Sequence, residues 1–138
     1  TLFPYTTLFR SRSVLYDPNP VQAGGGAGDC AVRAVAKALD ISWEQAYARL
    51  CMNGFLMGDL PNSDLVWSSV LRQEGFVRDI LPNTCPECYT VADFCNDNRK
   101  GTYVLKSENH VATVINGTLY DAWNSERKVP VYYWTRKE

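Results

Sequence analysis

The chain has 138 residues, of which 46% are hydrophobic, so it is long enough to bury the core of one domain. Its 14 basic and 15 acidic residues give a net charge of −1, and no basic run stands out, which argues against a nucleic-acid partner. No apolar stretch approaches about eighteen residues, so we expect no membrane-spanning segment.

The first residues of the chain read TLFPYTTLFRS. This stretch resembles the translation of sequencing-adapter read-through at the ends of assembled metagenomic reading frames. We therefore expect residues 1–11 to lie outside the fold and residues 12–138 to form a single domain. The alternative is that residues 1–11 supply a core strand at the front of the domain.

Helix signals come first along the chain. An Ala- and Val-rich run after a glycine-rich segment predicts a helix over residues 29–39. Residues 42–45, SWEQ, have the spacing of a capping box. They predict a second helix over residues 43–52 that ends at Gly54 as a left-handed cap.

Two more helices are expected before the pattern changes. The third begins after a cap at Asn62 or Ser63 and ends at Gly75. Its expected apolar stripe consists of Leu65, Val66, Val70 and Leu71. The fourth is shorter, covers residues 91–98 and has Thr90 as its cap.

Strand signals dominate the rest of the chain. Four short segments rich in β-branched and aromatic residues follow: TYVLKS, HVATVI, TLYDAW and VPVYYW. Asn116-Gly117 joins the middle two and is the strongest local signal for a two-residue hairpin turn. We therefore predict an α+β domain with a helical N-terminal half packed on a C-terminal antiparallel sheet.

The hairpin brings together residues that can carry chemistry. A turn at residues 116–117 places Trp123 opposite His110 and makes His110 and Asp121 diagonal neighbours on one face. Their backbones should be about 7–8 Å apart, a gap that an imidazole and a carboxylate can span. Trp123 can then shield the resulting hydrogen bond from water. Asn124 falls on the other face and is less suited to orient the histidine.

Cys30 stands where the glycine-rich segment becomes the first predicted helix. Unpaired N–H groups and the positive end of the helix dipole favour a thiolate there. The same N–H groups, including that of Cys30, can hold the oxyanion that forms when a thiolate adds to an amide carbonyl. Cys30, His110 and Asp121 therefore form a candidate set of nucleophile, base and orienting acid.

Three segments, GDCAVRAVAKAL, HVATVING and LYDAWNS, resemble in their order the papain-like cysteine peptidase superfamily in a small form. The resemblance implies a papain-like fold and a Cys30-His110-Asp121 triad that hydrolyses peptide or amide bonds through an acyl-enzyme. It also implies an oxyanion glutamine, for which Gln22 is the candidate and Asn19 a substitute. A peptide or protein substrate is expected, and no cofactor. Peptidase, deamidase and isopeptidase activities share this apparatus.

Other interpretations remain open at this point. Stretches such as CPECYTVADFC are similar to proteins of gut bacteria and their phages, so one alternative is a non-catalytic binding or structural protein with the same fold. A small zinc module is a further alternative, with Cys85, Cys88 and Cys95 as ligands and Cys51 as a fourth thiolate. The odd number of cysteines and the lack of a secretory segment predict a cytoplasmic protein with free thiols.

Overall fold

The computed structural model describes residues 12–21 and 28–137, and the expectation for residues 1–11 concerns residues outside this part. The described helices are α2 (Cys30–Leu39), α3 (Trp43–Met57), α4 (Asp64–Gln73) and α5 (Val91–Asp97). The strands are β1 (Arg12–Leu15), β2 (Val77–Ile80), β3 (Thr102–Ser107), β4 (His110–Ile115), β5 (Thr118–Asp121) and β6 (Tyr132–Thr135). None of these helices is long and apolar enough to cross a membrane.

The strands form one six-stranded sheet in the order β1-β5-β4-β3-β6-β2. The predicted α+β class is confirmed, and the four predicted C-terminal strands form antiparallel pairs, but the sheet also includes β1 and β2, which were not predicted. β1 pairs in parallel with β5, while the other neighbours are antiparallel. A parallel pair needs a long crossover, and here the crossover contains the whole helical half of the chain. The sheet is therefore mixed.

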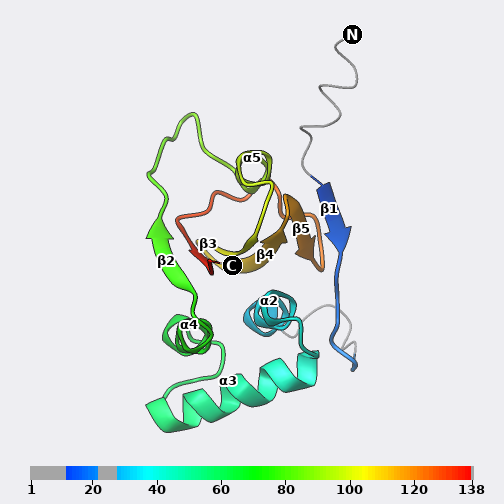
Figure 1. Ribbon diagram of the computed structural model, residues 1–138, viewed down its shortest axis with the longest axis vertical. Helices are drawn as coiled ribbons and strands as arrows, with labels where there is room; N and C mark the ends of the chain where they lie inside the picture. Colours follow the sequence, from blue (N-terminus) through cyan, green and yellow to red (C-terminus); the bar gives the residue numbers. More distant parts are fainter. Residues whose placement is uncertain (1–11, 22–27, 138) are drawn as a thin grey trace.

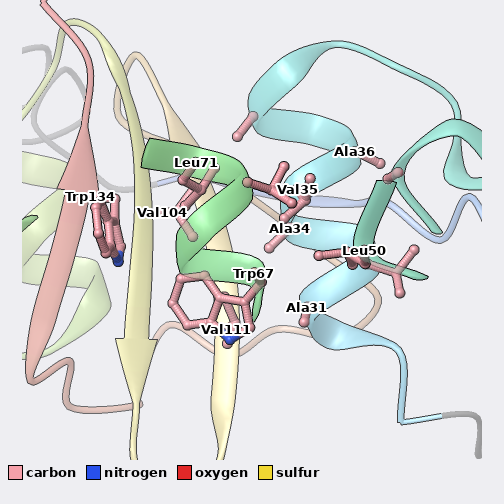
Figure 2. Close-up of a cluster of buried hydrophobic side chains, with 14 of the residues drawn as sticks. Ala31, Ala34, Val35, Ala36, Leu50, Trp67, Leu71, Val104, Val111 and Trp134 are labelled. Carbon is pink, nitrogen blue, oxygen red and sulfur yellow. The ribbon is translucent and has the colours of Figure 1, made fainter. Parts of the chain in front are cut away.

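Helices cover both faces of the sheet (Figure 1). α2, α3 and α4 lie on one side, where α2 packs directly against β4. The core on this side joins the apolar faces of the three helices to Val104, Val111 and Trp134 of the sheet (Figure 2). α5 lies on the other side, where Phe94 and its neighbours pack on a second cluster of strand residues.

The N-termini of α3, α4 and α5 follow the predicted capping signals, whereas Asp29 makes no side-chain cap at the start of α2. Ser42 and Gln45 form a reciprocal capping box at the start of α3, and Ser63 caps α4. Thr90 forms a capping box with Asp93 at the start of α5. In each case a side chain satisfies a backbone N–H that the helix itself leaves unpaired.

Two predictions about α3 and α4 are wrong. α3 continues past Gly54 and ends one turn later at Gly58, which has a left-handed φ of 69°. Gly54 is instead a contact point, because the returning chain folds against it and Asp59 N–H donates to Gly54 O at 2.9 Å. Leu65 was expected in the core but is 68% exposed, and Trp67 is buried in that helix instead.

We predict that Gly54→Ala destabilises the fold. An alanine Cβ would lie 2.7 Å from the backbone oxygen of Asp59, which cannot move away as a side chain could. The free energy of unfolding should fall by about 1–3 kcal/mol, the usual cost of overpacking. Urea unfolding followed by circular dichroism measures it.

Met52→Ala is the matched control, because Met52 lies in the same helix and is 58% exposed. Its unfolding free energy should stay within about 0.5 kcal/mol of the unmodified chain. Equal stability of Gly54→Ala and the unmodified chain would contradict the proposed close contact.

Candidate active site

The sheet and α2 bring the three candidate side chains to one place. Cys30 is the first residue of α2, His110 the first of β4 and Asp121 the last of β5. β4 and β5 are antiparallel neighbours with the register predicted for the hairpin, including Val114 opposite Leu119. The start of β4 and the end of β5 therefore lie at the same end of the sheet, and α2 packs on β4 there.

His110 and Asp121 are in direct contact. His110 Nε2 lies 2.6 Å from Asp121 Oδ2, and both side chains are buried. The Trp123 ring lies 5.0 Å from the imidazole, centroid to centroid, and covers part of it. This contact leaves Nδ1, the other ring nitrogen, to face a different partner.

The pKa of the Cys30 thiol reflects hydrogen bonding to the His110 side chain and to the backbone of Val111, so the sulfur lies within interaction range of both. Burial opposes ionisation of the sulfur, but these hydrogen bonds and the positive charges of His110 and Arg33 outweigh it. The pKa of Cys30 is therefore lower than that of an ordinary cysteine. The thiol is also only half-buried, so reagents can reach it.

The pKa of His110 is raised and the pKa of Asp121 is lowered, so the charged form of each is favoured. Burial disfavours a charged imidazole, yet the hydrogen bonds and charges of Asp121 and Cys30 raise the pKa of His110 to about 9. Burial also opposes the Asp121 carboxylate, but hydrogen bonds from His110, Ser125 and the Ala122 N–H lower the pKa of Asp121. The geometry thus favours a thiolate beside an imidazolium.

Two further residues complete this cluster and were not among the predicted site residues. Ser125 Oγ donates to Asp121 Oδ2 at 2.5 Å. Arg33 Nη2 donates to Asp121 Oδ1 at 3.1 Å, and Arg33 Nη1 donates to Asp29 Oδ1 at 2.6 Å. The four-residue spacing of Asp29 and Arg33 on a predicted helix is a sequence signal for their ion pair. Nothing local in the sequence links Arg33 to a strand 88 positions away.

A pocket of about 330 Å³ lies beside the start of α2. The rings of Trp43 and Tyr47 in its lining stack at 5.1 Å. Its lining residues are Asn19, Val21, Gly28, Asp29, Val32, Trp43, Tyr47, Pro61 and Asn62. Asp29 therefore belongs both to this pocket and, through Arg33, to the cluster around Asp121.

The other predicted polar residues lie elsewhere or outside the described part. Gln22 is outside the described residues. The Asn19 side chain donates to Asp29 Oδ2 at 3.4 Å and accepts from the Val21 N–H. Asn124 accepts a hydrogen bond from the backbone N–H of Glu126, in the loop after β5.

The prediction of free thiols is wrong for Cys85 and Cys88, which form a disulfide. A tight turn, in which Glu87 N–H donates to Thr84 O at 3.1 Å, brings the two ends of the C-P-E-C segment together. Cys95 is buried in the α5 core, and burial together with the charge of Glu126 raises its pKa to about 12. Among the described residues no group of three or more His, Cys, Asp or Glu is placed to hold a metal, so the structure does not assemble the zinc site considered above.

Comparison with known proteins gives no family for the chain: no family model, no curated protein and no solved structure matches it.

Proposed function

We propose that this protein is a cysteine-dependent hydrolase of peptide or amide bonds, related to the papain-like peptidases. The observation that carries the proposal is the chain of interactions from the Cys30 thiol through His110 to Asp121: His110 Nε2 lies 2.6 Å from Asp121 Oδ2, and hydrogen bonding with His110 lowers the pKa of Cys30. Such a chain supplies a nucleophile, a proton carrier and a group that orients the carrier. Its three members come from separate elements of the fold, α2, β4 and β5.

The first half of the reaction forms an acyl-enzyme. The Cys30 thiolate attacks the carbonyl carbon of the substrate amide, and the carbonyl oxygen becomes an oxyanion. When the oxyanion collapses, the carbon–nitrogen bond breaks and the leaving nitrogen takes the proton from His110. The products of this half are a thioester on Cys30, a neutral His110 and a free amine.

The second half releases the acyl group with water. Neutral His110 accepts a proton from water, and the resulting hydroxide adds to the thioester carbonyl. Breaking the carbon–sulfur bond then gives a carboxylic acid product and restores the thiolate–imidazolium pair. Asp121 keeps the imidazole in one orientation and stabilises its charged form throughout, because it holds Nε2 at 2.6 Å.

The start of α2 is the proposed site for the oxyanion. The first hydrogen bond of the helix runs from Arg33 N–H to Asp29 O at 2.9 Å, so the N–H of Cys30 precedes the helical ladder. An N–H at this end of a helix also has the helix dipole behind it. We assign to the Cys30 N–H the stabilisation of the oxyanion.

We predict that iodoacetamide at pH 7 modifies Cys30 faster than any other free cysteine. The lowered pKa of Cys30 gives it more thiolate than an ordinary cysteine, and Cys95 is both buried and shifted upward in pKa. His110→Ala should slow modification of Cys30 at least about tenfold. Peptide mapping by mass spectrometry follows each thiol separately.

Cys51 is the internal control in this experiment, because it is also half-buried and its rate should not respond to His110→Ala. A diverse peptide library, with Cys30→Ala as the inactive variant, then tests hydrolysis. If Cys30 reacts no faster than Cys51 and no peptide is cleaved, the protein is not the proposed hydrolase and a binding role takes its place.

The hydrolysis rate should be bell-shaped in pH. It should rise as Cys30 ionises, below the ordinary thiol range, and fall near pH 9 as His110 loses the proton that the leaving amine needs. Asp121→Asn removes a hydrogen-bonded negative charge that raises the pKa of His110. The midpoint of the falling limb should therefore move from near pH 9 toward about pH 6.5, which is the pKa of an unperturbed histidine.

Ser125→Ala is the matched control, since it removes a hydrogen bond to the same carboxylate and leaves its charge in place. Its falling limb should stay closer to that of the unmodified enzyme. A falling limb that is the same with and without Asp121→Asn would contradict the assigned role of Asp121.

A further inference from the structure

Arg33 is a buried cation that the reaction above does not use as a reactant. The Arg33 residue is only 7% exposed. Arginine is rarely buried without a partner of opposite charge, so this burial calls for one. Its Nη1 donates to Asp29 at 2.6 Å and its Nη2 donates to Asp121 at 3.1 Å. The planar fork of a guanidinium suits this arrangement, because its N–H groups can serve two carboxylates at once.

Asp29 gives Arg33 a fixed attachment point. Trp43 Nε1 donates to Asp29 Oδ2 at 3.0 Å, and Asn19 Nδ2 donates to the same oxygen at 3.4 Å. These two residues belong to α3 and to the segment after β1. The other oxygen of Asp29 is left for Arg33, so Asp29 holds one terminal nitrogen of the guanidinium while the other binds Asp121.

Asp121 divides its two oxygens between different partners. Oδ1 accepts from Arg33 and from the Ala122 N–H at 2.8 Å. Oδ2 accepts from Ser125 and faces His110 Nε2. Rotation of the carboxylate would break a buried ion pair, so Arg33 keeps Oδ2 directed at the imidazole.

We propose that Arg33, anchored by Asp29, is a positioning residue that keeps Asp121 ionised and oriented toward His110. The inference rests on the proposed function, because it assigns Arg33 a part in activating Cys30. Asp29 and Asp121 share one guanidinium, so its removal takes a positive partner from both carboxylates. The buried Asp121 carboxylate then keeps His110 but has lost the charge of Arg33, and it is more easily protonated.

A protonated Asp121 would no longer stabilise a positive imidazole, and the Cys30 thiolate would lose its counter-ion. Other ionisable groups at this face include Tyr16, Tyr120, Lys37 and Asp40. Burial raises the pKa of Tyr16, while the charge of Arg33 lowers it and that of Asp40 raises it. The Lys37 ammonium lies 5.2 Å from the Tyr16 ring centroid and 4.2 Å from that of Tyr120. Lys37 is thus directed to the tyrosines, and no salt bridge between Lys37 and Asp121 is found among the described residues.

The test measures the rate of Cys30 alkylation by iodoacetamide against pH in Arg33→Met, which keeps an apolar stem and removes the charge. The midpoint of the profile should rise by about one pH unit, which lowers the rate near pH 7 about tenfold. Arg33→Lys keeps a positive charge and should recover most of the shift. Arg49→Met removes an ion pair with Glu74 far from the triad and should leave the profile unchanged.

Arg33→Met leaves an unbalanced buried carboxylate and is the variant most at risk of misfolding. The pair variant Asp29→Asn/Arg33→Met removes an anion and a cation together, and the same rise in midpoint is expected in it. Circular dichroism identifies the folded variants, and only these are compared.

The outcomes separate the two levels of the proposal. If Cys30 of the unmodified protein reacts no faster than Cys51, the proposed function fails. If it reacts fast and the midpoint stays unshifted in folded Arg33→Met and in the folded pair variant, only the role of Arg33 is overturned. If neither Arg33→Met nor the pair variant folds, the ion pair is a requirement of the fold and the positioning role is withdrawn.

Discussion

The buried carboxylate of Asp121 is the constraint on which this end of the molecule depends. An ionised group that is 1% exposed must be compensated by hydrogen bonds and opposite charge, because its unpaired burial costs several kcal/mol. The partners come from separate parts of the chain: Arg33 from α2, His110 from β4 and Ser125 from the loop after β5. Satisfying this one group therefore ties the helical layer to the sheet at the point where Cys30 lies.

α2 serves packing and chemistry at the same time. Its buried face is built largely of alanine and valine, and small side chains let a helix approach a sheet closely. The closeness is visible in the buried hydrogen bond of 2.7 Å from Thr113 Oγ1 of β4 to Ala34 O of α2. The same approach brings the first residue of the helix, Cys30, to the first residues of β4, so that its sulfur meets both an imidazole and a backbone N–H.

Local sequence signals predicted those features that neighbouring residues decide. Capping residues marked the starts of α3, α4 and α5, and Asn116-Gly117 marked the hairpin and its register. The predicted end of α3 was wrong because a glycine can end a helix or can allow another segment to pack closely against it. Gly58 supplies the left-handed cap, whereas Gly54 admits the returning chain, and only the position of Asp59 in space distinguishes them. β1 and β2 were missed because each is a four-residue edge strand whose residues are mostly exposed. Such a strand lacks the alternation of apolar and polar residues by which strands are recognised in a sequence.

The sequence by itself determined the helical first half and the strand-rich second half. It also determined that His110 and Asp121 are neighbours, because side chains alternate between the two faces of a hairpin and the turn fixes which residues are opposite each other. Only the tertiary structure decided that Cys30 reaches His110, that β1 joins the sheet in parallel and that Arg33 binds Asp121. These contacts join segments many residues apart, and their geometry follows from how α2 packs on the sheet. No local pattern of residues encodes that packing, since it results from the summed burial of side chains on every element that meets there.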